Sequence, residues 1–194
     1  MKKLITTLMA VGTIAFAGGN ISPVEPVVAE DSATTGAYVG LGLGSTWTYT
    51  KGNFDFSSDV AGESYIDPML GINLGYTFYT VGAFDLSAEG RILASYNADD
   101  FDTTIYSAYL KPKYTFTDYG FGVYGLLGLA HVRWNDGAYS VNKTGFSFGL
   151  GAEYQITKRV SVSADWTSNI WNKEVDGVKN LNNDVVMVWL NYKF

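Results

Sequence analysis

From residue 36 to residue 194, apolar side chains alternate with small or polar ones in a period of two. The first such stretch sets Val39, Leu41 and Leu43 on one face, with glycines at the positions between them and after Leu43. Alternation of this kind is typical of a β-strand whose two faces meet different surroundings, because successive side chains point to opposite sides. No stretch of about 18 apolar residues follows, so the sequence predicts no membrane-spanning helix in this region. The alternation therefore favours an all-β chain of two-faced strands.

Eight alternating segments fit into this region, and the connections between them alternate in length. Such connections along antiparallel strands place every long loop at one end of the sheet and every short turn at the other. With an even number of strands, both ends of the region fall at the short-turn end. The pattern predicts an eight-stranded antiparallel up-and-down β-barrel. Its expected tight turns are residues 78–83, 117–120 and 157–159, and its expected long polar loops are 51–64, 97–103, 135–143 and 172–183.

Composition excludes several classes of protein. The 13 basic and 19 acidic residues give a net charge of −6, which is the wrong sign for gripping the phosphates of a nucleic acid. The absence of cysteine excludes disulfides, thiolate metal sites and cysteine nucleophiles. A single histidine, His131, excludes the common multi-histidine metal sites. We therefore expect no metal and no cofactor.

The N-terminal residues have the features of an export signal. Two lysines precede an uncharged stretch over residues 4–16, and Ala15-Phe16-Ala17 offers small residues at the positions where signal peptidase cleaves. The apolar stretch is too short for a spanning helix, which needs about 20 residues. We predict a cleaved signal peptide over residues 1–17, an extended periplasmic linker over 18–35 and a barrel over 36–194.

Three features indicate that the apolar faces point outward into a membrane. The polar faces are rich in Gly and Ser and carry charges of both signs, which suits a crowded barrel interior better than a soluble surface. Each segment provides the roughly 9–11 residues that a spanning strand needs. Aromatic residues on the apolar faces gather at two heights, as in the two girdles of a membrane barrel. The girdle residues are Trp47, Tyr49, Tyr76, Phe78, Phe84, Tyr96, Tyr106, Tyr114, Phe116, Trp134, Tyr154 and Trp166.

The fifth segment, residues 121–134, has two faces that are both apolar or glycine. Neither face identifies itself as the outer one, so we expect the face with the two basic residues, His131 and Arg133, to point inward. This choice predicts that the outward residues are Tyr124, Leu126, Ala130, Val132 and Trp134.

Seven charged residues fall on the predicted inner face. A buried charge without a partner costs several kcal/mol, so these residues are expected to pair with one another. Because the interior of an eight-stranded barrel is just wide enough for side chains to fill, a polar plug is favoured over an ion path or gate. The predicted lumen network is Asp85, Glu89, Arg91, Lys111, Lys113, Glu153 and Asp165.

The end strands carry a resemblance to a known family. The last segment places apolar residues at every second position up to a terminal aromatic one, and the first segment reads Tyr-Val-Gly-Leu-Gly-Leu-Gly. Over residues 36–194 the chain resembles the small eight-stranded outer-membrane proteins of Gram-negative bacteria, of the OmpX type, the OmpA membrane domain and the "porin family" barrels. The residues that resemble the family's C-terminal insertion signal are Val186, Val188, Leu190, Tyr192 and Phe194.

The resemblance implies a monomer in the bacterial outer membrane with both termini in the periplasm. It also implies contact with outer-membrane lipids, lipopolysaccharide, periplasmic chaperones and the barrel assembly machinery. A structural or surface-interaction role, in adhesion or envelope integrity, is favoured, and the alternative is a narrow, low-conductance pore. A more remote alternative is a lipid-modifying enzyme, but we expect no enzyme. His131 is followed by Val132 and Arg133 rather than by the His-x-Ser pattern of outer-membrane lipid A deacylases.

Overall fold

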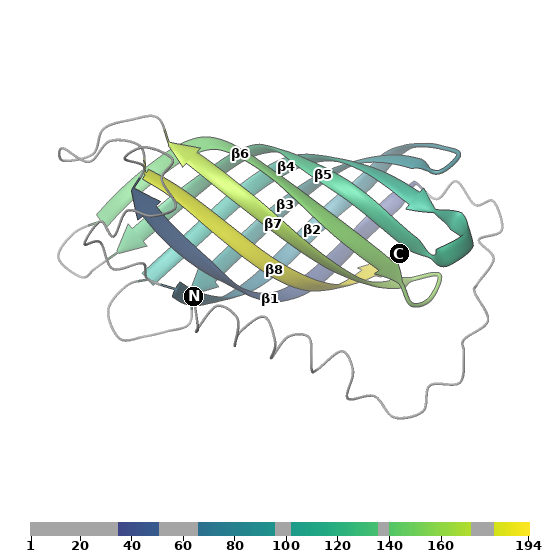
Figure 1. Cartoon of the computed structure of the whole chain (residues 1–194), viewed down its shortest axis with the longest axis horizontal. Coiled ribbons are helices and arrows are strands. Elements are labelled where there is room, and N and C mark those ends of the chain that lie inside the picture. The colour runs from purple at the N-terminus through teal and green to yellow at the C-terminus, as the bar shows by residue number, and fades with distance from the viewer. Residues whose placement is uncertain (1–34, 51–65, 96–101, 136–139, 172–180) are drawn as a thin grey trace, which may run out of the picture.

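The computed structural model describes residues 35–50, 66–95, 102–135, 140–171 and 181–194, which form one closed sheet (Figure 1). Each strand pairs antiparallel with its neighbour in sequence, and β1 pairs with β8, so the predicted eight-stranded antiparallel barrel is confirmed. Among these residues no helix is both long and apolar enough to cross a membrane. The strands are β1 Gly36–Thr50, β2 Ile66–Val81, β3 Phe84–Ser95, β4 Asp102–Phe116, β5 Phe121–Asn135, β6 Ser140–Gln155, β7 Val160–Trp171 and β8 Leu181–Lys193.

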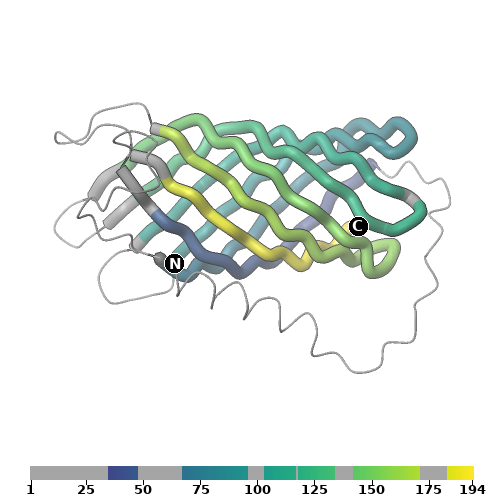
Figure 2. Tube along the Cα trace, in the orientation of Figure 1, coloured from purple at the N-terminus to yellow at the C-terminus, as the bar shows by residue number. Residues whose placement is uncertain are grey.

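The strands run obliquely around the barrel, as the tube in Figure 2 shows. They contain 12 to 16 residues, more than the roughly 9–11 that a spanning strand needs. The three short turns, β2–β3, β4–β5 and β6–β7, lie together at the end where the chain finishes (Figure 1). The β4–β5 turn contains a 3₁₀ turn, η1 Thr117–Tyr119.

The barrel closes at this same end. Val39 of β1 pairs with Tyr192 of β8, and the Phe194 amide donates a hydrogen bond to the Ala37 carbonyl at 3.0 Å. Residues 36 and 194 therefore lie beside each other at the short-turn end, as the alternation of connections predicts. The predicted signal peptide and most of the linker lie outside the described residues.

The predicted division into faces agrees with the exposure of the side chains in seven of the eight strands. On β1, Leu41 is 67% exposed and Leu43 is 63% exposed, whereas Thr46 is buried. On β8, Leu190 is exposed and its neighbours Trp189 and Asn191 are buried.

Strand β5 is the exception, and its predicted register is wrong. Tyr124, Leu126, Ala130 and Val132 are buried in the interior, whereas Leu127 and Leu129 are exposed on the outer wall. His131 and Arg133 therefore point outward. The side chain of Trp134 is not among those that the structure describes. Toward the long loops the inner face of β5 is apolar, because Ala130 and Val132 belong to one buried apolar cluster with residues of four other strands.

The interior contains an apolar layer on the long-loop side of the charged residues. Its members come from five strands, β2, β3, β4, β5 and β8, and all are at most 3% exposed. Most of these strands also carry polar residues on the inner face nearer the short turns. The alternation of faces along the sequence therefore does not show where the lumen changes from polar to apolar. The layer consists of Met69, Leu93, Ile105, Ala130, Val132, Val185, Met187 and Trp189.

Two irregularities interrupt the ladders. In β2 the register against β3 shifts between Thr77 and Tyr79, so that Phe78 and Tyr79 are both exposed. In β4, Pro112 lacks an amide hydrogen, and the β4–β5 pairing is broken between Leu110 and Lys113 but resumes in the same register. The closed sheet thus accommodates a proline without a shift.

The predicted aromatic girdles are largely on the outer wall. Six of the residues nearest the short turns are exposed, namely Tyr76, Phe78, Phe84, Tyr114, Phe116 and Tyr154. Toward the long loops, Tyr106 is exposed and Trp47 and Trp166 are half-buried. The side chains of Tyr49, Tyr96 and Trp134 lie outside the described ones.

Candidate functional site

The first candidate site is an ion pair that crosses the lumen. Arg91 on β3 and Asp165 on β7 come from opposite sides of the barrel. The Arg91 guanidinium donates from Nη1 to Oδ1 and from Nη2 to Oδ2 of Asp165, both at 2.8 Å. This two-bond geometry is the most directional contact that a guanidinium makes with a carboxylate. It ties together two strands that share no ladder.

Glu89 connects this pair to a second base. Its Oε1 accepts from Arg91 Nε at 2.6 Å, and its Oε2 accepts from Lys111 Nζ at 2.8 Å. The Tyr38 hydroxyl donates to the same Oε2 at 2.6 Å. Glu89 on β3 therefore receives three hydrogen bonds from three strands.

Asp165 receives further donors as well. The Tyr124 hydroxyl donates to Oδ2 at 2.8 Å, and the Trp189 indole donates to the same oxygen at 3.1 Å. The aromatic rings also cover the bases. The Arg91 guanidinium carbon lies 4.9 Å from the centroid of Trp189, and Lys111 Nζ lies 4.3 Å from that of Tyr124. Such cation–π contacts are stronger in a desolvated site than in water.

These four charged residues make one balanced layer, which we call the charged layer. Glu89, Arg91, Lys111 and Asp165 are 2%, 3%, 4% and 4% exposed, and their two positive and two negative charges cancel. Because every charge is paired and hydrogen-bonded, the layer avoids the cost of an isolated buried ion.

The remaining three predicted network residues form a separate group near the short-turn end. Lys113 Nζ lies 2.8 Å from Glu153 Oε1 and 3.4 Å from Asp85 Oδ2. The Thr80 hydroxyl also donates to Asp85, at 2.8 Å. These charged side chains are 15% to 21% exposed, so this group reaches water where the charged layer does not. All seven sequence-predicted residues are thus interior, but they make two groups rather than one.

Sequence reasoning missed the aromatic and apolar part of the site. Tyr38, Tyr124 and Trp189 bind or cover the charges, and the other members of the apolar layer lie on the long-loop side of them. The sequence of β3 does indicate this layer, because the alternation places the apolar Leu93 on the same inner face as Glu89 and Arg91. The same signal occurs on β8, where Met187 and Trp189 alternate with outward valine and leucine.

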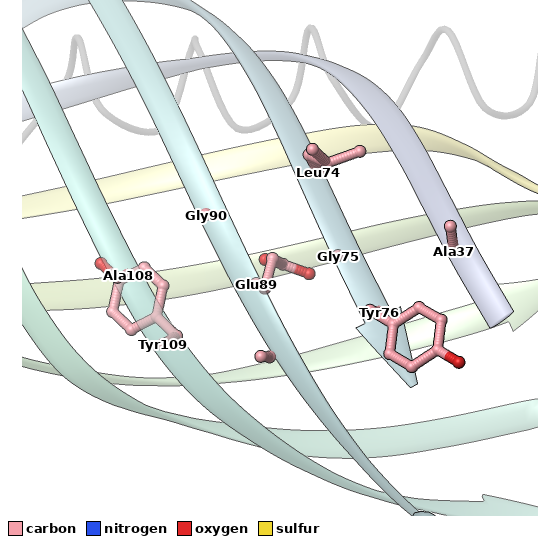
Figure 3. A pocket seen from close by; sticks show the side chains of 9 residues that line it. Ala37, Leu74, Gly75, Tyr76, Glu89, Gly90, Ala108 and Tyr109 are labelled. Carbon is pink, nitrogen blue, oxygen red and sulfur yellow. The ribbon is translucent and has the colours of Figure 1, made fainter. Parts of the chain in front are cut away.

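The outer wall has a shallow hollow of about 410 Å³ across β1 to β4, and Figure 3 shows the residues around it. The hollow forms where small outward residues lie beside the larger Leu74 and Tyr76. The small residues are Ala37, Ala88, Gly90 and Ala108. The lining is almost entirely apolar, and the Glu89 carboxylate belongs to the charged layer inside the barrel. The hollow therefore belongs to the apolar outer wall and not to the lumen.

His131 lies on the outer wall, away from the interior groups. Its Nδ1 is 2.8 Å from the Thr144 hydroxyl oxygen, and its ring centroid is 6.4 Å from that of Tyr106. Within the described ranges, no group of three or more His, Cys, Asp or Glu side chains could hold a metal ion.

Solved structures of bacterial surface proteins share this architecture. Neisserial surface protein A is 20% identical, with a TM-score of 0.56, over 81% of this chain and 97% of that one. Ail, the attachment invasion locus protein of Yersinia pestis, is 17% identical, with a TM-score of 0.56, over 83% of this chain and 100% of that one. A second Ail structure, in complex with the heparin analogue sucrose octasulfate, is 15% identical over 82% and 99%, with a TM-score of 0.55.

These identities are low, so the structural likeness shows the fold alone. A comparison with curated protein sequences found no match. The family model of the outer membrane protein beta-barrel domain matches residues 7–194, which is nearly the whole chain. The chain therefore belongs to the outer membrane protein beta-barrel family.

Proposed function

We propose that this protein is a closed outer-membrane barrel with a structural or surface-interaction role, in adhesion or envelope integrity. The observation that carries the proposal is the charged layer, which crosses the lumen through the paired hydrogen bonds between Arg91 and Asp165. A moving ion would have to break this pair and leave one charge unpaired in a dry interior, at a cost of several kcal/mol. The favoured role is therefore one that needs no open path.

The apolar layer adds a second barrier in series. Leu93, Ile105, Val132 and Met187 are each at most 3% exposed, so the lumen above the charges offers little room for water. An eight-stranded barrel is narrow enough for side chains to fill its interior. The runner-up function, a narrow low-conductance pore, requires both layers to open.

The description of one structurally similar protein also supports a role in surface interaction. Ail is described as an attachment invasion locus protein, and it has been crystallised with a sulfated heparin analogue. The long connections of the present chain are acidic, with Asp55, Asp59 and Glu63 in one and Asp99 and Asp100 in the next. We infer that these loops select against a polyanion of that kind, because like charges repel.

Conductance across a planar lipid bilayer tests the proposal. The full chain is inserted into the bilayer, and an open porin in the same membrane serves as the positive reference. The expected result for this chain is no stable single-channel steps at any salt concentration. Steps that are stable and increase with salt would establish the pore instead.

The remaining parts of the proposal have their own tests. Cleavage after Ala17 predicts that the exported protein begins at Gly18, which its intact mass measures. A monomer is expected in detergent by light scattering. We also propose that the chain is not an enzyme. Lipid deacylation by the purified barrel, lost on His131→Ala, would overturn that.

Insertion is proposed to depend on periplasmic chaperones and the barrel assembly machinery, through the C-terminal signal Val186, Val188, Leu190, Tyr192 and Phe194. In the structure the first four of these residues lie on the outward face of β8 and Phe194 follows its last residue, with the Tyr192 and Phe194 ring centroids 5.3 Å apart. Replacing Phe194 by Ser should reduce the amount of folded barrel in the outer membrane without changing its refolding in detergent.

A further inference from the structure

The outer wall carries a polar patch toward the long-loop end, where β4, β5 and β6 lie side by side. It consists of two rows of paired residues, and we call it the rim patch. The lower row is Tyr106, His131 and Thr144, and the upper row is Thr104, Arg133 and Asn142.

The rim patch begins abruptly. The row next to it on the short-turn side is Ala108, Leu129 and Phe146, in which Leu129 is 59% exposed and Phe146 is 50% exposed. A wall of exposed apolar side chains fits the hydrocarbon of a bilayer. The change to hydroxyl, imidazole, guanidinium and amide groups therefore marks the height of the lipid headgroups.

Arg133 is exceptional among the described strand residues. Among the strand side chains whose exposure the structure describes, it is the only charged one that is exposed, and no ion pair joins it to another of them. A guanidinium binds phosphate through two parallel hydrogen bonds, and a basic residue at a membrane surface gains about 1 kcal/mol from anionic lipid. Because Arg133 lies on the outer wall, its guanidinium points away from the barrel axis, toward the headgroups of the surrounding lipids.

The neighbours of Arg133 provide further hydrogen-bonding groups. Thr104 and Asn142 flank it in its own row. In the row below, His131 is held by the Thr144 hydroxyl at 2.8 Å and lies next to the Tyr106 ring. The set joins one cation to several neutral polar groups, which suits a phosphorylated sugar better than a simple ion.

The wall beside the rim patch also offers a place for a hydrocarbon chain. The hollow in Figure 3 begins at Ala108, two residues from Tyr106 along β4 toward the short turns, and continues over Gly90 and Ala88. A chain that leaves a headgroup at the rim patch can therefore lie close to the backbone along small side chains. A free phosphate ion would gain nothing from this hollow.

We propose that the rim patch binds a phosphorylated glycolipid of the outer leaflet, with Arg133 on the phosphate and the hollow beneath one acyl chain. This inference rests on the proposed outer-membrane location, with the long loops facing outward. It places the lipid contact on the barrel wall, separate from the acidic loops.

Titration of the folded full-length barrel in detergent tests the proposal, with diphosphorylated lipid A as the probe. The comparison lipids are enzymatically dephosphorylated lipid A and phosphatidylglycerol. The variant is Arg133→Gln, and the matched control is Lys158→Gln, which removes an exposed charge from the short turn at the opposite end. Retained secondary structure by circular dichroism shows that each variant is folded.

The expected result is that Arg133→Gln weakens the binding of diphosphorylated lipid A about fivefold, whereas Lys158→Gln leaves it unchanged. Dephosphorylated lipid A and phosphatidylglycerol should bind the unaltered chain more weakly than diphosphorylated lipid A. Equal affinity of the Arg133→Gln variant, or an equal loss in the control, would overturn the site. Equal binding of either comparison lipid would overturn the assignment of a phosphorylated glycolipid. None of these results depends on whether the lumen conducts.

Discussion

Gly42 on β1 and Trp189 on β8 are in such close contact that a Cβ atom at residue 42 would lie 2.5 Å from Cε3 of the indole. The indole is 1% exposed and donates its hydrogen bond to Asp165, so it has little freedom to withdraw. The absence of a side chain at residue 42 is therefore part of how the charged layer is held.

A matched pair of glycine substitutions tests this contact. Gly42→Ala should lower the free energy of unfolding by about 1–3 kcal/mol, because it overpacks the lumen. Gly90 is on the outer wall, where a Cβ atom would come no closer than 3.9 Å to the Leu74 and Ser107 carbonyls. Gly90→Ala should therefore be neutral or slightly stabilising. Urea titration of the barrel in detergent measures both, and equal effects would show that the indole moves aside.

Breaking the ion pair across the lumen should be costly. Asp165→Ala leaves the Arg91 guanidinium buried with only Glu89 as its acid partner, and a loss of about 3–5 kcal/mol is expected. The double variant Arg91→Met with Asp165→Leu should recover part of that loss, because it removes both charges together. Denaturant unfolding checks the comparison, and a double variant no more stable than Asp165→Ala would contradict the reasoning.

The two interior groups should differ in sensitivity. Glu89→Ala should lower stability by about 3–5 kcal/mol, because it strips Lys111 and Arg91 of a shared acid in a closed layer. Glu153→Ala should cost less, since Lys113 keeps Asp85 and lies near water. Unfolding in detergent ranks the two variants. An unchanged transition for Glu89→Ala would mean that the layer does not stabilise the barrel.

The register of β5 can be tested by spin labelling, because the chain contains no cysteine to interfere. A label on Leu127→Cys, at a position that is 53% exposed, should collide freely with oxygen dissolved in lipid. A label on Leu126→Cys, at a position that is fully buried, should be immobile and shielded. The opposite pattern would restore the register in which His131 and Arg133 face the lumen.

The sequence predicted the barrel and most outward positions, because each of seven strands has one consistently apolar face and another on which small or polar residues recur. It failed at β5 because neither face of that strand is polar along its length. The assumption that basic residues face inward then decided the register, and it was wrong. Leu93 and Met187 make the lumen apolar at the height of His131 and Arg133, so these two side chains are better accommodated on the outer wall.

The pairing between charges was only partly predictable. Glu89 and Lys111 come from neighbouring strands, so their contact follows from chain order. Arg91 and Asp165 come from opposite sides of the barrel, and their relative height depends on strand tilt and stagger. Those quantities are properties of the closed sheet and are not encoded in any single segment.

The pairing of β1 with β8 has a consequence for the order of assembly. Every other ladder joins segments that follow each other along the chain, and this one joins its most distant segments. Because closing a longer loop costs more entropy, we expect this ladder to form after the hairpin ladders. Until β8 pairs with it, the edge of β1 that faces away from β2 is unpaired and available to any other strand. Pairing of β8 with β1 therefore removes the last strand edge with which a neighbouring copy could pair.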